Sequence, residues 1–177
     1  SMMNTVAGKQ DVFDSRNRML ALHRWSDDLL DLEKPVISAV QGSAFGAGLS
    51  LALAADFVFA APSAKFCCVF SKIGFVPDLG AMHLLPRLVG LQTAKELAFT
   101  ARVVGADEAK QLGMAYKVTG EDVLQEAIAF AERFANAPTE AMGMTKRVMN
   151  HAFETQRDEV YQQEAIMQLI VHCVNCR

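Results

Sequence analysis

Apolar residues recur along residues 11–32 at the spacing of one helix face, with charged residues between them. This pattern predicts a long amphipathic helix, whose apolar face we expect to pack on a sheet. Two short apolar runs follow, at residues 36–40 and 57–61. Such uninterrupted runs are typical of strands buried on both faces. Since consecutive strands usually pair, we expect these two to be neighbours.

The later part of the chain alternates briefly between strands and helices and then becomes helical. A third strand is predicted at residues 64–69 and an edge strand at 114–118. Helices are predicted at residues 84–89, 93–99, 106–112, 121–136, 138–153 and 156–173, with Thr93 as an N-cap. This order favours an α/β fold with a helical C-terminal layer. We expect one domain over residues 1–177, with a core at about 11–119 and a helical region at about 120–177.

Composition narrows the classes of partner. The chain has 177 residues, 51% of them hydrophobic, and a net charge of −3 without any basic run. The sequence therefore lacks the cluster of positive charges that is typical of nucleic-acid-binding proteins. The longest apolar run is interrupted by glycines and ends at Asp56, so no membrane span is expected. No signal peptide is recognised at the N-terminus. We expect a small-molecule ligand, and neither nucleic acid nor a membrane as partner.

Four cysteines stand at positions 67, 68, 173 and 176. In a chain without a recognised secretory segment, we expect reduced thiols. The C-x-x-C pair of Cys173 and Cys176 could be redox-active or half of a zinc site. With His172 it offers three ligands, which do not complete a structural zinc site, so no metal is expected.

A glycine-rich turn follows the first predicted strand. Gly42, Gly46 and Gly48 allow a sharp turn, after which a helix is predicted from near Ala47 to Ala55, buried on all sides. The free amides at the start of such a helix suit an anion or an oxyanion. Tight packing of strand against helix is the alternative explanation. The glycine spacing matches neither a P-loop nor a dinucleotide-binding turn.

The loop at residues 70–80 contains one acid in an apolar setting. Asp78 stands between Pro77 and Leu79 and close to Phe75. We expect partial desolvation of its carboxylate, which disfavours the charged form and suits a general base. The alternative is that Asp78 caps a helix beginning near Leu79.

Other polar residues carry weaker signals. Asp56 stands at a predicted helix end beside a buried strand, so we expect it to act in a turn or a cap. His83 and His151 lie on predicted helices without an obvious partner at ligand spacing, and we expect them to be structural or on the surface.

The stretch from Lys34 to Asp56 carries the clearest resemblance. It resembles the signature K-P-V-I-A-A-V-x-G-x-A-x-G-G-G-x-E-L-A-L-A-C-D of the crotonase superfamily of acyl-CoA enzymes, the enoyl-CoA hydratases and isomerases. The similarity continues in order through the Leu85-Pro86-Arg87-Leu88-Val89-Gly90 run and covers the chain from about Arg18 onward. It implies a crotonase-like fold, with a spiral core of β-β-α units.

In the family that this chain resembles, a thioester carbonyl lies between two backbone amides that stabilise an enolate. The resemblance places the second amide at Ala47, with Phe45, Gly46 and Gly48 near the substrate. Each such donor is typically worth about 2.7 to 4 kcal/mol.

Two positions depart from the pattern of the hydratases. Ser50 and Phe70 stand where those enzymes carry two glutamates that activate water, and neither side chain can act as a carboxylate base. The loop around Asp78 is instead similar to that of the double-bond isomerases. In those enzymes one acid after the proline moves a proton between the α- and γ-carbons. The resemblance therefore implies that Asp78 is the proton shuttle. The neighbours expected to contact substrate are Phe75, Pro77 and Leu79.

Family members also carry N-terminal strands and an A-x-x-G-x-D-like loop that supplies the first amide. No such loop is found before Asp11, so we expect this sequence to lack those strands. The family's final helix with an E-G motif is not found either.

The resemblance implies an isomerase of fatty acid metabolism that converts a 3-enoyl-CoA into a 2-enoyl-CoA. Coenzyme A would be part of the substrate, so no cofactor is expected. The alternatives are an enoyl-CoA hydratase and a non-catalytic acyl-CoA-binding or scaffold protein. Oligomerisation is expected, because apolar residues cluster near the C-terminus at Ile166, Leu169, Ile170 and Val171. The resemblance implies that the assembly is a trimer or a hexamer. The expected location is the cytoplasm in a bacterium, and otherwise the mitochondrion or peroxisome.

Overall fold

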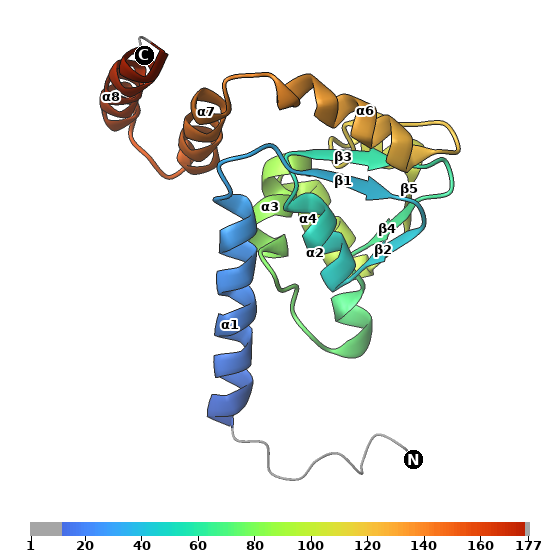
Figure 1. Cartoon of the computed structure of the whole chain (residues 1–177). Coiled ribbons are helices and arrows are strands. Elements are labelled where there is room, and N and C mark those ends of the chain that lie inside the picture. Colours follow the sequence, from blue (N-terminus) through green and yellow to red (C-terminus); the bar gives the residue numbers. More distant parts are fainter. Residues whose placement is uncertain (1–11, 176–177) are drawn as a thin grey trace.

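The computed structural model describes residues 12–175, in which helices surround two small sheets (Figure 1). The first sheet is parallel and has the order β1-β3-β6. Its strands are β1 (Ile37–Val40), β3 (Phe57–Ala60) and β6 (Lys117–Val118). Ile37 pairs with Phe57, and Val40 pairs with Ala60. The two apolar runs are therefore neighbouring strands, as predicted, and β6 is the predicted edge strand.

The second sheet contains two strands that were not predicted. Its members are β2 (Ser43–Phe45), β4 (Lys65–Cys67) and β5 (Val104–Gly105), in the order β2-β4-β5. The β2 strand lies inside the glycine-rich stretch, where only Ala44 of its three residues is buried. Strands of two or three residues are too short to show a hydrophobic period. Their existence depends on pairing with β4, which is distant in sequence.

Helix α2 (Ala47–Leu53) follows β2 and contacts β1, β2 and α3. Four of its seven residues are buried: Leu49, Ser50, Ala52 and Leu53. Leu51 is 36% exposed, so the prediction of a helix buried on all sides was wrong. The helix also ends at Leu53 and not at Ala55.

The next elements are the 3-10 helix η2 (Val69–Ile73), α3 (Ala81–Val89), α4 (Leu91–Thr100) and α5 (Ala106–Gln111). The predicted N-cap at Thr93 was wrong. Helix α4 is preceded by Gly90, whose φ of 77° lies in the left-handed region, and Thr93 is the third helical residue. A glycine adopts this backbone conformation without strain. Gly90 separates α3 from α4, and α4 begins at Leu91, two residues before Thr93.

Helix α1 (Val12–Leu30) has nearly the predicted length but not the predicted packing. It extends along the side of the core rather than across a sheet (Figure 1). Leu22 and Trp25 are 45% and 50% exposed, whereas Ser26 is buried. Leu29 and Leu30 are half-buried, so contact with the rest of the protein is concentrated from Ser26 to the end of the helix. The expectation that the apolar face packs on the sheet was wrong.

The C-terminal part is helical, as predicted. It comprises α6 (Val123–Ala135), α7 (Thr139–His151) and α8 (Arg157–Asn175). Helix α6 covers β1 and β3, where Phe130 packs edge-on against Phe57 with ring centroids 5.1 Å apart. Helices α7 and α8 contact each other and project from the side of the core (Figure 1). Among the helices of residues 12–175, none has the length and apolarity needed to cross a bilayer.

Candidate active site

Asp78 lies in the segment between η2 and α3. The residue that precedes α3 is Gly80, which has a φ of 81°, and no side chain caps this helix. Asp78 contributes its backbone instead, since its carbonyl oxygen accepts the Ala81 N–H at 3.0 Å. The alternative that the Asp78 side chain caps a helix was therefore wrong, and the carboxylate is left for another role.

One carboxylate oxygen of Asp78 is buried without a partner. The Oδ1 atom has no hydrogen bond to any of the described residues. A buried unpaired oxygen costs free energy, because it has lost water and gained nothing in exchange. Such a group needs an explanation, and proton transfer to a bound ligand supplies one.

Ser50 joins the glycine turn to the Asp78 segment. Its side chain is completely buried, and its hydroxyl donates a hydrogen bond of 2.9 Å to the carbonyl oxygen of Asp78. The same hydroxyl lies 3.4 Å from the carbonyl oxygen of Gly46. The first turn of α2 and the acid are thus held together, although 28 residues separate Ser50 from Asp78.

The amides at the start of α2 differ in their availability. The Gly46 N–H donates to the carbonyl oxygen of Cys67 at 3.0 Å, as part of the contact between β2 and β4. The Ala47 N–H is the first amide of the helix, and the first amides of a helix have no acceptor within it. Ala47 is also exposed. Its amide is therefore available to an oxyanion.

Phe70 closes the other side of the glycine turn. A Cβ added at Gly46 would lie 3.3 Å from Val69 Cγ1 and 3.8 Å from Phe70 Cζ, and Gly46 has a φ of 55°. Phe70 itself is 6% exposed. Both positions at which the hydratases would carry a glutamate are thus buried beside this turn, one with a hydroxyl and one with an apolar ring.

The remaining predicted site residues are not equally well placed. Leu79 is buried and Pro77 is half-buried, and both adjoin Asp78 in the chain. Phe75 is 69% exposed, so it does not provide the apolar setting that the sequence predicted for Asp78. Phe45 is 39% exposed at the end of β2, and Gly48 is exposed in the first turn of α2.

Sequence reasoning missed Ser26 on α1. Its hydroxyl donates to the carbonyl oxygen of Leu79 at 3.3 Å, across 53 residues of sequence, and its side chain is buried. Nothing in the local pattern singled out this serine, because it stands on the helix beside exposed residues such as Trp25 and Asp27. Only the packing of α1 against the Asp78 segment shows its contact.

Asp78 also lines a cavity of about 810 Å³. Helices α1 and α3 form two of its walls, and the end of α7 and the turn before α8 form another. Polar side chains are frequent in the lining, among them His23, Ser26, His83, Asn150 and His151. His83 and His151 are exposed, as predicted, and they face this cavity.

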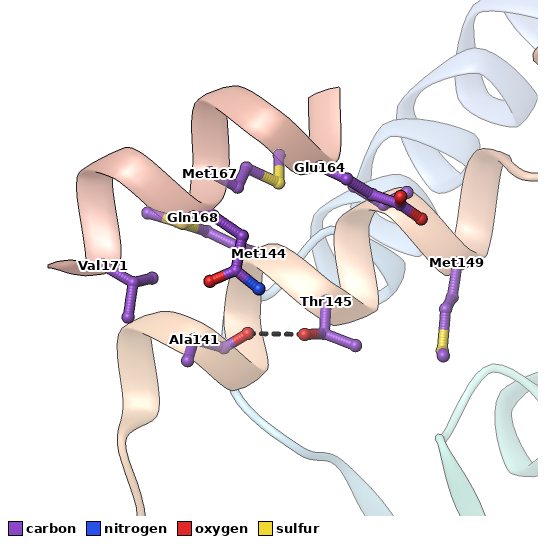
Figure 2. A pocket seen from close by; sticks show the side chains of 9 residues that line it. Ala141, Met144, Thr145, Met149, Glu164, Met167, Gln168 and Val171 are labelled. Atoms are coloured by element: carbon purple, nitrogen blue, oxygen red, sulfur yellow. Dashed lines mark hydrogen bonds between the residues drawn. The ribbon is translucent and has the colours of Figure 1, made fainter. Parts of the chain in front are cut away.

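A smaller hollow of about 180 Å³ lies between α7 and α8 (Figure 2), and Asp78 is not among the residues that line it. Figure 2 shows methionine side chains from both helices around it, together with Glu164 and Gln168. Within this lining, the Thr145 hydroxyl donates to the carbonyl oxygen of Ala141 at 2.7 Å, a bond within one helix. This hollow contains none of the predicted site residues.

Cys68, near the site, is a poor nucleophile. Cys67 and Cys68 are buried and unpaired. Burial raises the pKa of the Cys68 thiol above its ordinary value, and the neighbouring Cys67 adds to this. A protonated thiol is a weak nucleophile and metal ligand. Cys176 lies outside the described residues, and within residues 12–175 no three His, Cys, Asp or Glu side chains are grouped to hold a metal ion.

Comparison with known proteins determines the family. Residues 3–173 match the family model described as enoyl-CoA hydratase/isomerase. This chain belongs to that family. The expectation of a crotonase-like α/β fold is confirmed by an enoyl-CoA hydratase/isomerase from Cupriavidus metallidurans CH34. Its crystal structure superposes with a TM-score of 0.89 at 39% identity, covering 93% of this chain and 62% of that one.

Two proteins that are similar to this chain are named for different reactions. The 1,2-epoxyphenylacetyl-CoA isomerase of Escherichia coli K12 is 42% identical over 135 residues, which are 73% of this chain and 52% of the relative. The carnitinyl-CoA dehydratase of Salmonella heidelberg is 37% identical over 135 residues, which are 76% of this chain and 52% of the relative. The chain thus spans about half the length of these curated relatives.

Proposed function

We propose that the protein containing this chain is an enoyl-CoA isomerase that converts a 3-enoyl-CoA into a 2-enoyl-CoA. The observation that carries this proposal is the Asp78 carboxylate, whose Oδ1 atom is buried and unpaired and whose backbone is bonded to the first turn of α2 through Ser50. A double-bond shift requires an acid that moves a proton and an amide that binds an oxyanion. The family and its CoA-dependent relatives support a thioester substrate.

The proposed reaction needs one proton shuttle. The Asp78 carboxylate takes a proton from the α-carbon, and the electron pair of that C–H bond moves onto the thioester oxygen as a dienolate. The Ala47 N–H, at the positive end of α2, stabilises the negative oxygen. Asp78 then returns the proton to the γ-carbon, and the double bond forms between the α- and β-carbons. Atoms and charge balance without a cofactor.

The hydratase alternative is favoured by the similarity to a carnitinyl-CoA dehydratase. Against it stand Ser50 and Phe70, because water activation by the route of the family needs carboxylates at those positions. Hydration of crotonyl-CoA by the full-length protein tests this alternative directly. If the protein binds acyl-CoA but turns over neither substrate, the non-catalytic alternative is supported.

The test of the proposal is the Asp78→Asn variant of the full-length protein, assayed for isomerisation of a 3-enoyl-CoA. Loss of the proton shuttle should lower kcat by at least about 100-fold, because general acid–base groups typically contribute a factor of 10² to 10⁴. Asp107→Asn is the matched control, since Asp107 is an exposed acid in the first turn of α5. Equal rates for the wild type and Asp78→Asn would remove Asp78 from the mechanism.

We further propose that the protein assembles into a trimer or hexamer through its C-terminal helices. Three apolar residues of α8 are 44% to 67% exposed, namely Ile166, Leu169 and Ile170. Side chains of this size are normally covered when they cluster on one surface. A monomeric mass from light scattering of the full-length protein would contradict this proposal.

A further inference from the structure

We propose that Ser50 and Ser26 are positioning residues that fix the backbone beneath the Asp78 carboxylate. This inference rests on the proposed role of Asp78. Ser50 donates to the carbonyl oxygen of Asp78 at 2.9 Å, and Ser26 donates to the carbonyl oxygen of Leu79 at 3.3 Å. Two consecutive carbonyl groups are thus held by hydroxyls from two different helices, α2 and α1.

The backbone at this point needs such support. Leu79 has a φ of 50°, and Gly80 follows with a φ of 81°. A left-handed conformation is unfavourable for leucine, and it persists only where the surroundings hold it in place. The Leu79 side chain is 6% exposed, so it anchors the segment as well. Without the two hydroxyls, rotation of the Asp78–Leu79 or Leu79–Gly80 peptide would relieve this strain.

Such a rotation would move the carboxylate relative to the amide that binds the oxyanion. Ala47 and Ser50 lie on the same short helix, three residues apart. The bond from Ser50 to Asp78 therefore connects the two halves of the proposed machinery through a single turn of α2. Proton transfer to carbon depends steeply on geometry, and a displacement of about 1 Å can cost a factor of about 100 in rate.

The chemistry of Ser50 suits positioning and not proton transfer. The hydroxyl has one hydrogen, and the bond to Asp78 is shorter than the 3.4 Å approach to Gly46. The Ser50 side chain is completely buried, so it does not contact solvent. The position that corresponds to a glutamate in the hydratases thus holds a hydrogen-bond donor that acts on the backbone of the acid.

The experiment compares Ser50→Ala, Ser26→Ala and Ser50→Thr with Ser38→Ala in the full-length protein. Ser38 is a matched control, because its hydroxyl also donates to a backbone carbonyl of α2, that of Ala52 at 3.1 Å. Hydrogen exchange of the peptide that contains residues 76–84 is measured without ligand. In that peptide the amides of Ala81 and His83 bond to Asp78 and Gly80. We expect exchange at least about tenfold faster in Ser50→Ala and Ser26→Ala, and unchanged exchange in Ser38→Ala.

Steady-state kinetics provide the second measurement. Both alanine variants should lose about 10- to 100-fold in kcat with KM within about twofold, because substrate binding does not require the exact position of the carboxylate. Ser50→Thr keeps a hydroxyl and should retain most of the activity. If Ser50→Ala fails to fold, Ser26→Ala decides the question alone.

Two outcomes would overturn the inference. One is unchanged exchange of residues 76–84 in the alanine variants, and the other is a kcat loss equal to that of Ser38→Ala. Failure of the isomerase proposal can be distinguished from failure of this inference. In that case the wild type is inactive on 3-enoyl-CoA, whereas the exchange measurement still reports whether the two serines fix the segment.

Discussion

The Lys146 ammonium lies 2.8 Å from Oδ2 of Asp56, across 90 residues of sequence. The two side chains are only 9% and 22% exposed. The same Asp56 oxygen accepts the Val36 N–H at 2.7 Å, immediately before β1. Helix α7 is thereby fixed to the start of the parallel sheet. The expectation that Asp56 acts in a turn or a cap was wrong, because the C-cap of α2 is Ala54 and the Asp56 side chain connects segments that are distant in sequence.

We predict that Asp56→Asn lowers the free energy of unfolding by about 1.5–3 kcal/mol, the usual range for a hydrogen bond to a charged group. Urea titration of the full-length protein measures this change. Asp158→Asn is the control, because Asp158 pairs with Arg157 at a site where its side chain is 82% exposed. Exposed pairs of this kind contribute about 0–1 kcal/mol. Equal losses in the two variants would contradict a special role for Asp56.

Helix α7 also lies close to the segment that precedes β1, at Gly143. A Cβ added there would lie 2.7 Å from Glu33 Cβ and 2.8 Å from the Glu33 carbonyl oxygen. Gly143→Ala should therefore destabilise the protein by about 1–3 kcal/mol, as overpacking does, although alanine favours helices.

Gly48→Ala should have the opposite effect on stability to Gly143→Ala. Gly48 lies in α2, and an added Cβ would meet nothing within 4 Å. We expect a stabilisation of about 0.5–1 kcal/mol from helix propensity. Thermal unfolding of both variants tests the contrast, and a shift of the same sign in both would contradict the close contact at Glu33.

The amide of Ala47 can be removed without removing the helix. Ala47 is the first residue of α2, the position at which proline is best tolerated. Ala47→Pro should therefore leave the fold intact, as checked by circular dichroism. It should lower kcat for 3-enoyl-CoA by about 10²- to 10³-fold, as loss of one oxyanion donor does. Ala47→Gly keeps the N–H and should stay near the wild-type rate. A fully active Ala47→Pro variant would mean that another group binds the oxyanion.

The stability of the folded protein at acidic pH should depend on Glu126. Its side chain bonds to Lys117 Nζ at 2.6 Å and to the Gly120 N–H at 2.7 Å. These bonds, that of Lys117 first, lower the pKa of Glu126 below its ordinary value. Since the folded-state pKa is depressed, the stabilisation is present above the unfolded pKa of about 4.3. It is lost as the pH falls through the lower folded value.

The measurement is the free energy of unfolding of wild type and Glu126→Gln between pH 7 and pH 3. The advantage of the wild type should be constant at neutral pH and should shrink below about pH 4. Glu132→Gln, at an exposed position on the same helix, is the matched control. If the stability advantage of the wild type over Glu126→Gln grew as the pH fell, the folded-state pKa of Glu126 would be raised and not lowered, which would contradict the prediction.

The apolar runs of β1 and β3, the periodic pattern of α1 and the acid in the loop were readable in the sequence. These signals are local, because burial on both faces or on one face leaves a period in neighbouring residues. The resemblance to a known family predicted the fold family and the two site residues Asp78 and Ala47. It also identified Ser50 and Phe70 as the positions at which this chain differs from the hydratases.

The short strands β2 and β5 could not be predicted, since each depends on a partner far away in the chain. The exposure of Phe75 and the loose packing of α1 also depend on tertiary contacts, which the pattern of neighbouring residues does not predict. The role of Ser26 is the clearest case, because 53 residues separate it from Leu79. By itself, the sequence determined the main helices, the strands of the parallel sheet and which acid stands in the loop. The tertiary structure decided what holds that acid, because hydrogen bonds between α1, α2 and the loop exist only once the chain has folded.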